Sequence, residues 1–155
     1  MAAANNTANF VPYDGAWVLE QHPFLASVEI TDGYAVGFEI SSNTTTGYLD
    51  LMGTENAAGF DFAGILAEPI DSDDDDYATD GKLKSVWVPT SPLAKAKFYV
   101  GAGTFTAVDV YKTVQFHSDS AGLAVDTAGL GARIVKYLDS THGLCTFSMP
   151  TTQTA

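Results

Sequence analysis

Short alternations of apolar and polar residues, separated by turns rich in Gly, Asp and Ser, run through most of this chain and limit what it can fold into. Residues 24–30 and 34–40 alternate most cleanly, and Asp32-Gly33 lies between them as a turn. A repeat of two is the side-chain period of a β-strand. The pattern therefore predicts two antiparallel strands joined as a hairpin.

The same alternation recurs along the rest of the chain, with its longest run at residues 108–117, which predicts a central or bent strand. Two segments also fit helical starts: residues 55–67, which are rich in Ala and Leu, and Ser91-Pro92. Other strands are expected at 47–52, 62–70, 85–88, 95–100, 123–125, 132–138 and 144–149, the last two joined as a closing hairpin. The alternation places Phe116 and Phe147 on the buried faces of their strands. Short strands without a long amphipathic helix predict an all-β fold, a small β-barrel or sandwich of short antiparallel strands.

The N-terminal segment lacks a sustained period but carries large apolar side chains. Phe10, Tyr13, Trp17 and Leu19 stand among Ala, Asn and Thr. Ordering about twenty residues costs roughly 1–2 kcal/mol each, so local contacts alone do not hold such a segment. We expect an extended arm that is mobile in the free protein and docks on a partner subunit through these four side chains. The predicted organisation is an arm at 1–22, a single β domain at 23–150 and a polar tail at 151–155.

Composition limits the partners. Nineteen acidic residues against seven basic ones give a net charge of −12, which repels nucleic-acid phosphates and anionic membrane surfaces. No apolar run reaches the roughly 20 residues that a membrane helix needs. Cys145 is the only cysteine, which excludes an intrachain disulfide and a Cys-based zinc site and suits a reducing cytoplasm. We expect no nucleic-acid partner and no membrane partner.

Residue types that carry chemistry do not form a recognisable constellation. His22, His117 and His142 lack metal-pair spacing and are expected at the surface, whereas Cys145 should face the core. The glycine pairs at 101–103 and 129–131 lead into strands, which is typical of turns and not of phosphate loops. We predict that the protein is not an enzyme and needs no cofactor or metal.

The acidic run at residues 71–76 invites a calcium site, because calcium prefers clustered carboxylates. A twelve-residue calcium loop, however, needs glycine at its sixth position and glutamate at its twelfth. Asp76 and Lys82 occupy those positions when the count begins at Asp71. The run is therefore expected to be a solvated and dispensable loop.

The order of segments after residue 61 resembles that of a known family. The segments are 62–67 (FAGILA) before the charged loop, 109–116 (DVYKTVQF), 123–127 (LAVDT), and the closing pair 132–139 (ARIVKYLD) and 141–147 (THGLCTF). In this order the chain resembles the tailed-phage capsid decoration proteins of the small β-barrel type, also called cement or head-stabilising proteins.

The resemblance implies a structural virion protein, made in the host cytoplasm, that binds the outer capsid surface. It would stabilise the shell by bridging neighbouring major capsid subunits, with copies of itself grouped as trimers and an N-terminal arm reaching to neighbours. Two alternatives stay open. One is a carbohydrate- or ligand-binding β-sandwich that uses Trp17, Trp87 or Tyr99 as a stacking platform. The other is a head-fibre or tail domain.

Overall fold

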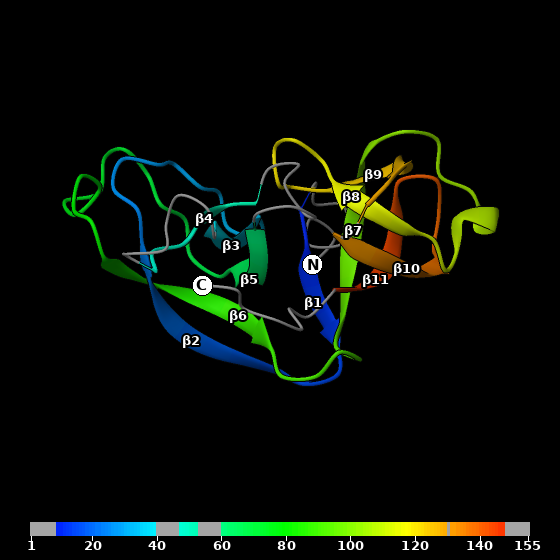
Figure 1. The fold of residues 1–155 in the computed structure, drawn as a ribbon, viewed down its shortest axis with the longest axis horizontal. Coiled ribbons are helices and arrows are strands. Elements are labelled where there is room, and N and C mark those ends of the chain that lie inside the picture. Colours follow the sequence, from blue (N-terminus) through cyan, green and yellow to red (C-terminus); the bar gives the residue numbers. More distant parts are fainter. Residues whose placement is uncertain (1–8, 40–46, 53–59, 130, 148–155) are drawn as a thin grey trace.

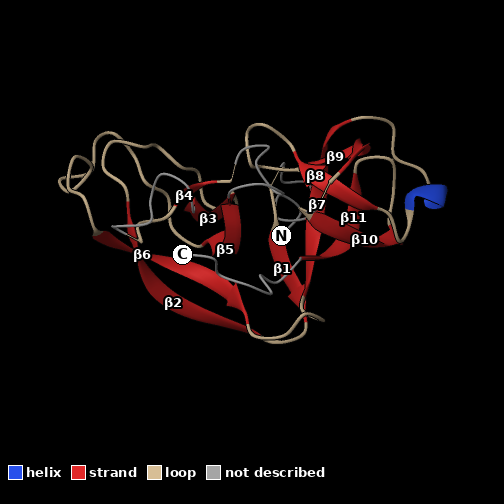
Figure 2. Cartoon of the chain, viewed as in Figure 1, coloured by secondary structure: helices blue, strands red, loops and turns tan. Residues whose placement is uncertain are grey.

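The computed structural model describes residues 9–39, 47–52, 60–129 and 131–147, and these form strands joined by loops and one short 3-10 helix (Figures 1 and 2). The all-β prediction is confirmed. The elements are β1 (Val11–Asp14), β2 (Trp17–Phe24), β3 (Ala35–Glu39), β4 (Asp50–Leu51), β5 (Phe60–Leu66), β6 (Lys82–Pro89), β7 (Lys95–Ala102), η1 (Ala107–Asp109), β8 (Thr113–Phe116), β9 (Leu123–Ala128), β10 (Ala132–Tyr137) and β11 (His142–Phe147).

The first sheet closes on itself. Its order is β1-β7-β11-β10-β8-β9, and β9 also pairs in parallel with β7, so pairing runs in a circle from β7 back to β7. Closure requires a close approach, since a Cβ on Gly122 would lie 2.4 Å from the carbonyl oxygen of Tyr99. Strand β1 pairs with residues 95–97 at the other end of β7. We call residues 9–14 and 91–147 the barrel half.

The second sheet has the order β2-β6-β5-β3-β4. Strand β2 pairs with β6 along all eight of its residues. An isolated parallel bridge joins Phe24, at the end of β2, to Leu49, just before β4. The sheet therefore curls until its two outer strands meet at one end only. We call residues 17–90 the sheet half.

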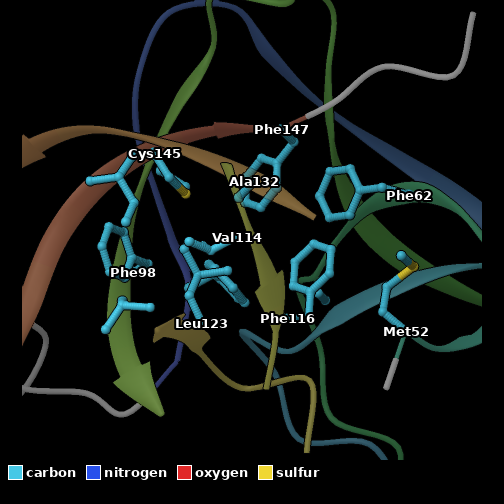
Figure 3. Packing of buried hydrophobic residues seen from close by; sticks show 14 of the residues in the cluster. Met52, Phe62, Phe98, Val114, Phe116, Leu123, Ala132, Cys145 and Phe147 are labelled. Atoms are coloured by element: carbon cyan, nitrogen blue, oxygen red, sulfur yellow. The ribbon is translucent and has the colours of Figure 1, made fainter. Parts of the chain in front are cut away.

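One aromatic core joins the two halves. Phe62 of the sheet half stacks on Phe147 of the barrel half, with ring centroids 4.2 Å apart, and on Phe116 at 5.8 Å. Figure 3 shows these three rings together. Phe10 meets Phe116 and Phe147 edge-on at 5.7 and 5.5 Å. Burial of Phe116 and Phe147 was predicted and is confirmed, because only 0% and 4% of their surface is exposed.

A second core lies on the other face of the sheet half. Neighbouring residues in a strand point to opposite faces. Accordingly Ala35 and Ile65 belong to the shared core while Val36 and Leu66 belong to the second one. The loops on this face contribute Ile30 and Ile70, which bridge each other. Both faces of this sheet are thus buried at its centre.

The predicted arm is wrong for residues 9–22. Phe10 is 1% exposed in the shared core, β1 pairs with β7, and β2 forms a ladder with β6. The argument from chain entropy counted local contacts, whereas pairing with strands 58–86 residues further along the chain supplies the missing stabilisation. The predicted arm residues 1–8 and the predicted tail 151–155 lie outside the described residues.

One predicted strand and the predicted hairpin are also wrong, whereas the strand predicted at 34–40 is present as β3. Strand β2 ends at Phe24, and Ser27 has a φ of 60°, so the alternating residues 24–30 form a loop whose apolar side chains cover the second core. Strand β3 pairs with β4 and β5, so the predicted hairpin does not form, although Gly33 turns with a φ of 87° as expected. Ser91-Pro92 begins a turn that leads into β7 and not a helix.

The long alternation at 108–117 is interrupted. Residues 107–109 form η1, Tyr111 has a φ of 76°, and only Thr113–Phe116 is strand. The physical reason is local hydrogen bonding by Asp109, described below. The terminal hairpin of β10 and β11 is present and antiparallel.

Candidate interaction surface

A loop at one end of the barrel half presents two exposed apolar side chains. Residues 104–112 connect β7 to β8, contain η1, and project furthest from the sheet half (Figures 1 and 2). Val108 is 79% exposed and Tyr111 is 67% exposed. Large apolar groups exposed to water on one loop are typical of a contact surface. We call residues 104–112 the tip loop.

Asp109 holds the tip loop in shape. It is 4% exposed, its Oδ2 accepts a hydrogen bond from the backbone N–H of Thr106 at 2.9 Å, and its Oδ1 accepts one from Lys112 Nζ at 2.7 Å. The Lys112 hydrogen bond, together with that of Thr106, lowers the pKa of Asp109 below its ordinary value. The carboxylate therefore stays ionised near neutral pH and fixes both ends of η1.

Tyr111 is fixed in a strained conformation that keeps its ring outside. A positive φ is unfavourable for a bulky residue and is usually retained where surrounding contacts enforce it. Here the N–H of Tyr111 donates to the carbonyl of Ile134 at 2.6 Å, and the Arg133 guanidinium lies 5.2 Å from the ring centroid. Phe105 anchors the start of the loop against Tyr137 at 5.1 Å. The exposed ring is preorganised.

A cavity adjoins the tip loop. Val114 pairs with Ala128 but the next residue, Gln115, pairs with Ala124, so three residues of β9 bulge away from β8. The cavity at this bulge has a volume of about 490 Å³ and is lined by Lys112, Thr113, Val114, Val125, Asp126 and Ala128. Asp126 Oδ2 accepts a hydrogen bond from the N–H of Thr104, at 3.1 Å, which ties the bulge to the tip loop. Loop and cavity form one continuous end of the barrel.

Charge is divided unevenly between the halves. The barrel half carries five acidic and five basic residues, and the sheet half carries fourteen acidic and two basic ones. The whole net charge of −12 therefore belongs to the sheet half. The barrel half therefore has no net charge that would repel a partner binding to the apolar side chains at its end.

The four residues predicted to contact a partner are not brought together. Phe10 is buried, and the indole of Trp17 packs on Phe147 with centroids 6.2 Å apart. Tyr13 on β1 and Leu19 on β2 remain 60% and 54% exposed. Phe10 is therefore unavailable for contact, while Tyr13 and Leu19 stay accessible on two different sheets.

The proposed aromatic platform is also dispersed. Trp17 Nε1 donates to the backbone carbonyls of Asp14 and Lys95, and Trp87 packs partly against the shared core. Tyr99 lies on the barrel against the imidazole of His142, 5.7 Å away. These three rings do not form one flat exposed face of the kind that stacks on a sugar.

His142 and Cys145 are both buried. His142 is 6% exposed, which corrects the expectation of a surface histidine, because it begins the inner strand β11. Cys145 is fully buried as predicted, and burial raises the pKa of its thiol far above the ordinary value. Within the ranges that the structure describes, no three His, Cys, Asp or Glu residues are grouped as metal ligands would be.

The acidic run at 71–76 forms successive turns. Asp74 Oδ2 accepts the N–H of Asp71 at 3.0 Å, and Asp76 pairs with Lys84 at 3.2 Å. These carboxylates are used in capping turns and in one ion pair. Glu29 also accepts the N–H of Ser72, at 3.1 Å, and so ties the run to the neighbouring loop.

Sequence reasoning missed the tip loop because apolar alternation at 108–116 favoured a strand. One signal was present: Thr106 followed three residues later by Asp109 fits the pattern of a helix N-cap box. That pattern predicts a local turn stabilised by the two side chains and would have placed Val108 outside.

Comparisons with protein-family models, with curated proteins and with solved structures found no match to this chain. Among the described residues, no helix is long and apolar enough to span a membrane.

Proposed function

We propose that this chain is a structural protein of a tailed-phage virion that binds the outer capsid surface. It stabilises the shell by bridging neighbouring major capsid subunits, with copies of itself grouped as trimers. The segments that carry the resemblance form β5, the tip loop with β8, β9 and the β10–β11 hairpin.

The observation that carries the proposal is the preorganised apolar tip loop on a half that has no net charge. Burying the side chains of Val108 and Tyr111 against a partner is worth roughly 1.5–3 kcal/mol each. Little ordering entropy is lost on binding, because Asp109 and the Ile134 hydrogen bond already fix the loop. The sheet half, with fourteen acidic residues, is then left facing solvent, where its charge keeps decorated particles apart.

Decoration of particles that lack the protein tests the proposal. Wild type and the double variant Val108→Ser, Tyr111→Ser are added to undecorated capsids of the source phage, and occupancy is measured by electron microscopy. The double variant should bind about 100-fold more weakly, the result of losing roughly 3 kcal/mol of apolar burial. Wild-type decoration should also raise the temperature of genome release.

Leu93→Ser is the matched control. Leu93 is 74% exposed and lies in the turn before β7, at the opposite end of that strand from the tip loop. This control should bind like wild type. Equal binding by wild type and the double variant would mean that the contact lies elsewhere than the tip loop. Failure of the wild type to bind any capsid would refute the proposed function.

A further inference from the structure

Strand β2 has an outer edge that the described parts of the chain leave without a partner along Trp17–Gln21. Its inner edge pairs with β6 throughout, and the bridge at Phe24 and Leu49 occupies only its last residues. Val18, Leu19, Glu20 and Gln21 are consecutively exposed. Such an edge is a template for another strand.

The direction of the backbone groups follows from the pairing. In an antiparallel ladder, successive residues alternate between bonding to the partner strand and pointing away from it. Ser85, which lies opposite Gln21, directs its N–H to Glu68 and its carbonyl to Ala67, away from β2. The carbonyl of Pro23 also points away from β6, because it accepts a hydrogen bond from the N–H of Leu49 at 2.8 Å. Trp17, Leu19 and Gln21 therefore direct their N–H and carbonyl groups outward.

The edge carries one exposed apolar side chain on each face. Leu19 is 54% exposed on the face that it shares with Trp87, and Val18 is 38% exposed on the opposite face. A strand added beside them would bury both side chains, one on each side of the sheet. Backbone bonds would supply affinity and the flanking apolar groups a preference for apolar neighbours.

Charge selects the occupant. The edge belongs to the half with fourteen acidic and two basic residues, and Glu20 lies within the exposed stretch. A second copy would bring another such half against it and be repelled. We propose that the outer edge of β2 binds an extended segment of a partner protein in which basic residues alternate with apolar ones. The site is distinct from the tip loop, and the inference does not depend on the proposed function.

A synthetic peptide with the sequence Lys-Val-Lys-Val-Lys-Val-Lys, blocked at both ends, is the probe. Its charge-matched control is Glu-Val-Glu-Val-Glu-Val-Glu. The basic peptide should bind the full chain at least tenfold more tightly, and raising NaCl from 50 to 300 mM should weaken it several-fold. Equal affinity for both peptides, or no binding of the basic one, would overturn the proposal.

Amide hydrogen exchange, followed residue by residue by NMR, locates the peptide. The outward amides of Leu19 and Gln21 should exchange fast in the free protein and at least tenfold more slowly with the basic peptide. Those of Val18 and Glu20, which face β6, should change less than twofold. Slow exchange of the Leu19 and Gln21 amides in the absence of peptide would overturn the proposal, because the edge would then already be covered. The cover would be a second copy if the exchange rate depended on protein concentration, and the chain itself if it did not.

Gln21→Pro supplies the variant test, because it removes one outward N–H without touching the bonds to β6. Its control, Gln21→Ala, keeps that N–H. The proline variant should bind the basic peptide at least tenfold more weakly than the alanine variant. If the proline variant does not fold, the exchange measurement on wild type decides the question alone.

Discussion

The barrel half and the sheet half are built from similar short strands and share one aromatic core, yet they differ in how their sheets end and in their charge. Pairing closes the barrel half into a circle and leaves a fixed loop at its end. In the described residues, the sheet half closes only at the bridge between Phe24 and Leu49, and this half carries the net charge of −12.

The difference shows how one chain can combine an exposed apolar loop on one half with an exposed edge strand on the other. An exposed edge strand tends to pair with other copies, and like charge around it is one means by which proteins prevent this. Among its described residues, the barrel half has no comparable long edge and can present Val108 and Tyr111 without the same protection. Acidic residues are therefore concentrated where self-pairing is the greater hazard.

Truncation in the two cores has the largest expected effect and tests whether the halves fold together. Phe116→Ala and Phe147→Ala in the shared core, and Phe24→Ala in the second core, should each cost about 3–5 kcal/mol of unfolding free energy. Urea unfolding followed by tryptophan fluorescence and by circular dichroism should give one coincident transition for every variant. Two separated transitions would mean that the halves are independent, and losses below about 1 kcal/mol would contradict the assigned burial.

Asp109→Asn comes next and tests what fixes the tip loop. The amide keeps the shape but loses the ionic bond to Lys112, at a cost of about 1–3 kcal/mol. The lowered pKa of Asp109 means that its contribution is complete above its unfolded pKa of about 3.9 and is lost as the pH falls through the folded value. The gap in melting temperature between wild type and variant should thus be constant from pH 5 to 7 and narrow below pH 4. A gap that widens in acid would contradict this role.

The acidic run should matter least. Replacing Asp73 to Asp76 with Ser and Gly removes the partly buried pair between Asp76 and Lys84 and one turn cap, each worth about 1 kcal/mol. The melting temperature should fall by only a few degrees, and a chelator should leave it unchanged. A drop of many degrees in the melting temperature on adding a chelator would reveal a structural cation. The charges of the two halves could then not be compared from their amino-acid residues alone.

Sequence pattern predicted the all-β class, the terminal hairpin and the burial of Phe116, Phe147 and Cys145, because period two and turn residues are local signals. It failed at residues 9–22, which are ordered by strands far along the chain, and at residues 24–30, where alternation covers a core without forming a strand. Pairing between strands that are far apart in the sequence, and packing of loop side chains on a core, do not produce a local periodicity from which they could be predicted.

The candidate surface was harder to predict than the fold. The exposed Val108 and Tyr111 lie in an alternating run, and only the tertiary bond from Tyr111 to Ile134 decides that the ring stays outside. The sequence could not identify β2 as an edge strand for a related reason. A strand lies at an edge when no other strand pairs with one of its sides, and this is decided by the tertiary structure. Leu19 was named from the sequence as a contact residue, but as part of an arm.

Hydroxyl-radical footprinting of the wild-type protein, free and on decorated capsids, tests most directly whether the tip loop at the end of the barrel half makes the contact. Tyr111 and Leu83 are both well exposed, at 67% and 56%, and lie in the barrel half and the sheet half respectively. Docking through the tip loop predicts that oxidation of Tyr111 falls at least fivefold on the capsid while that of Leu83 is unchanged. Protection of Leu83 with Tyr111 still fully oxidised would contradict the account.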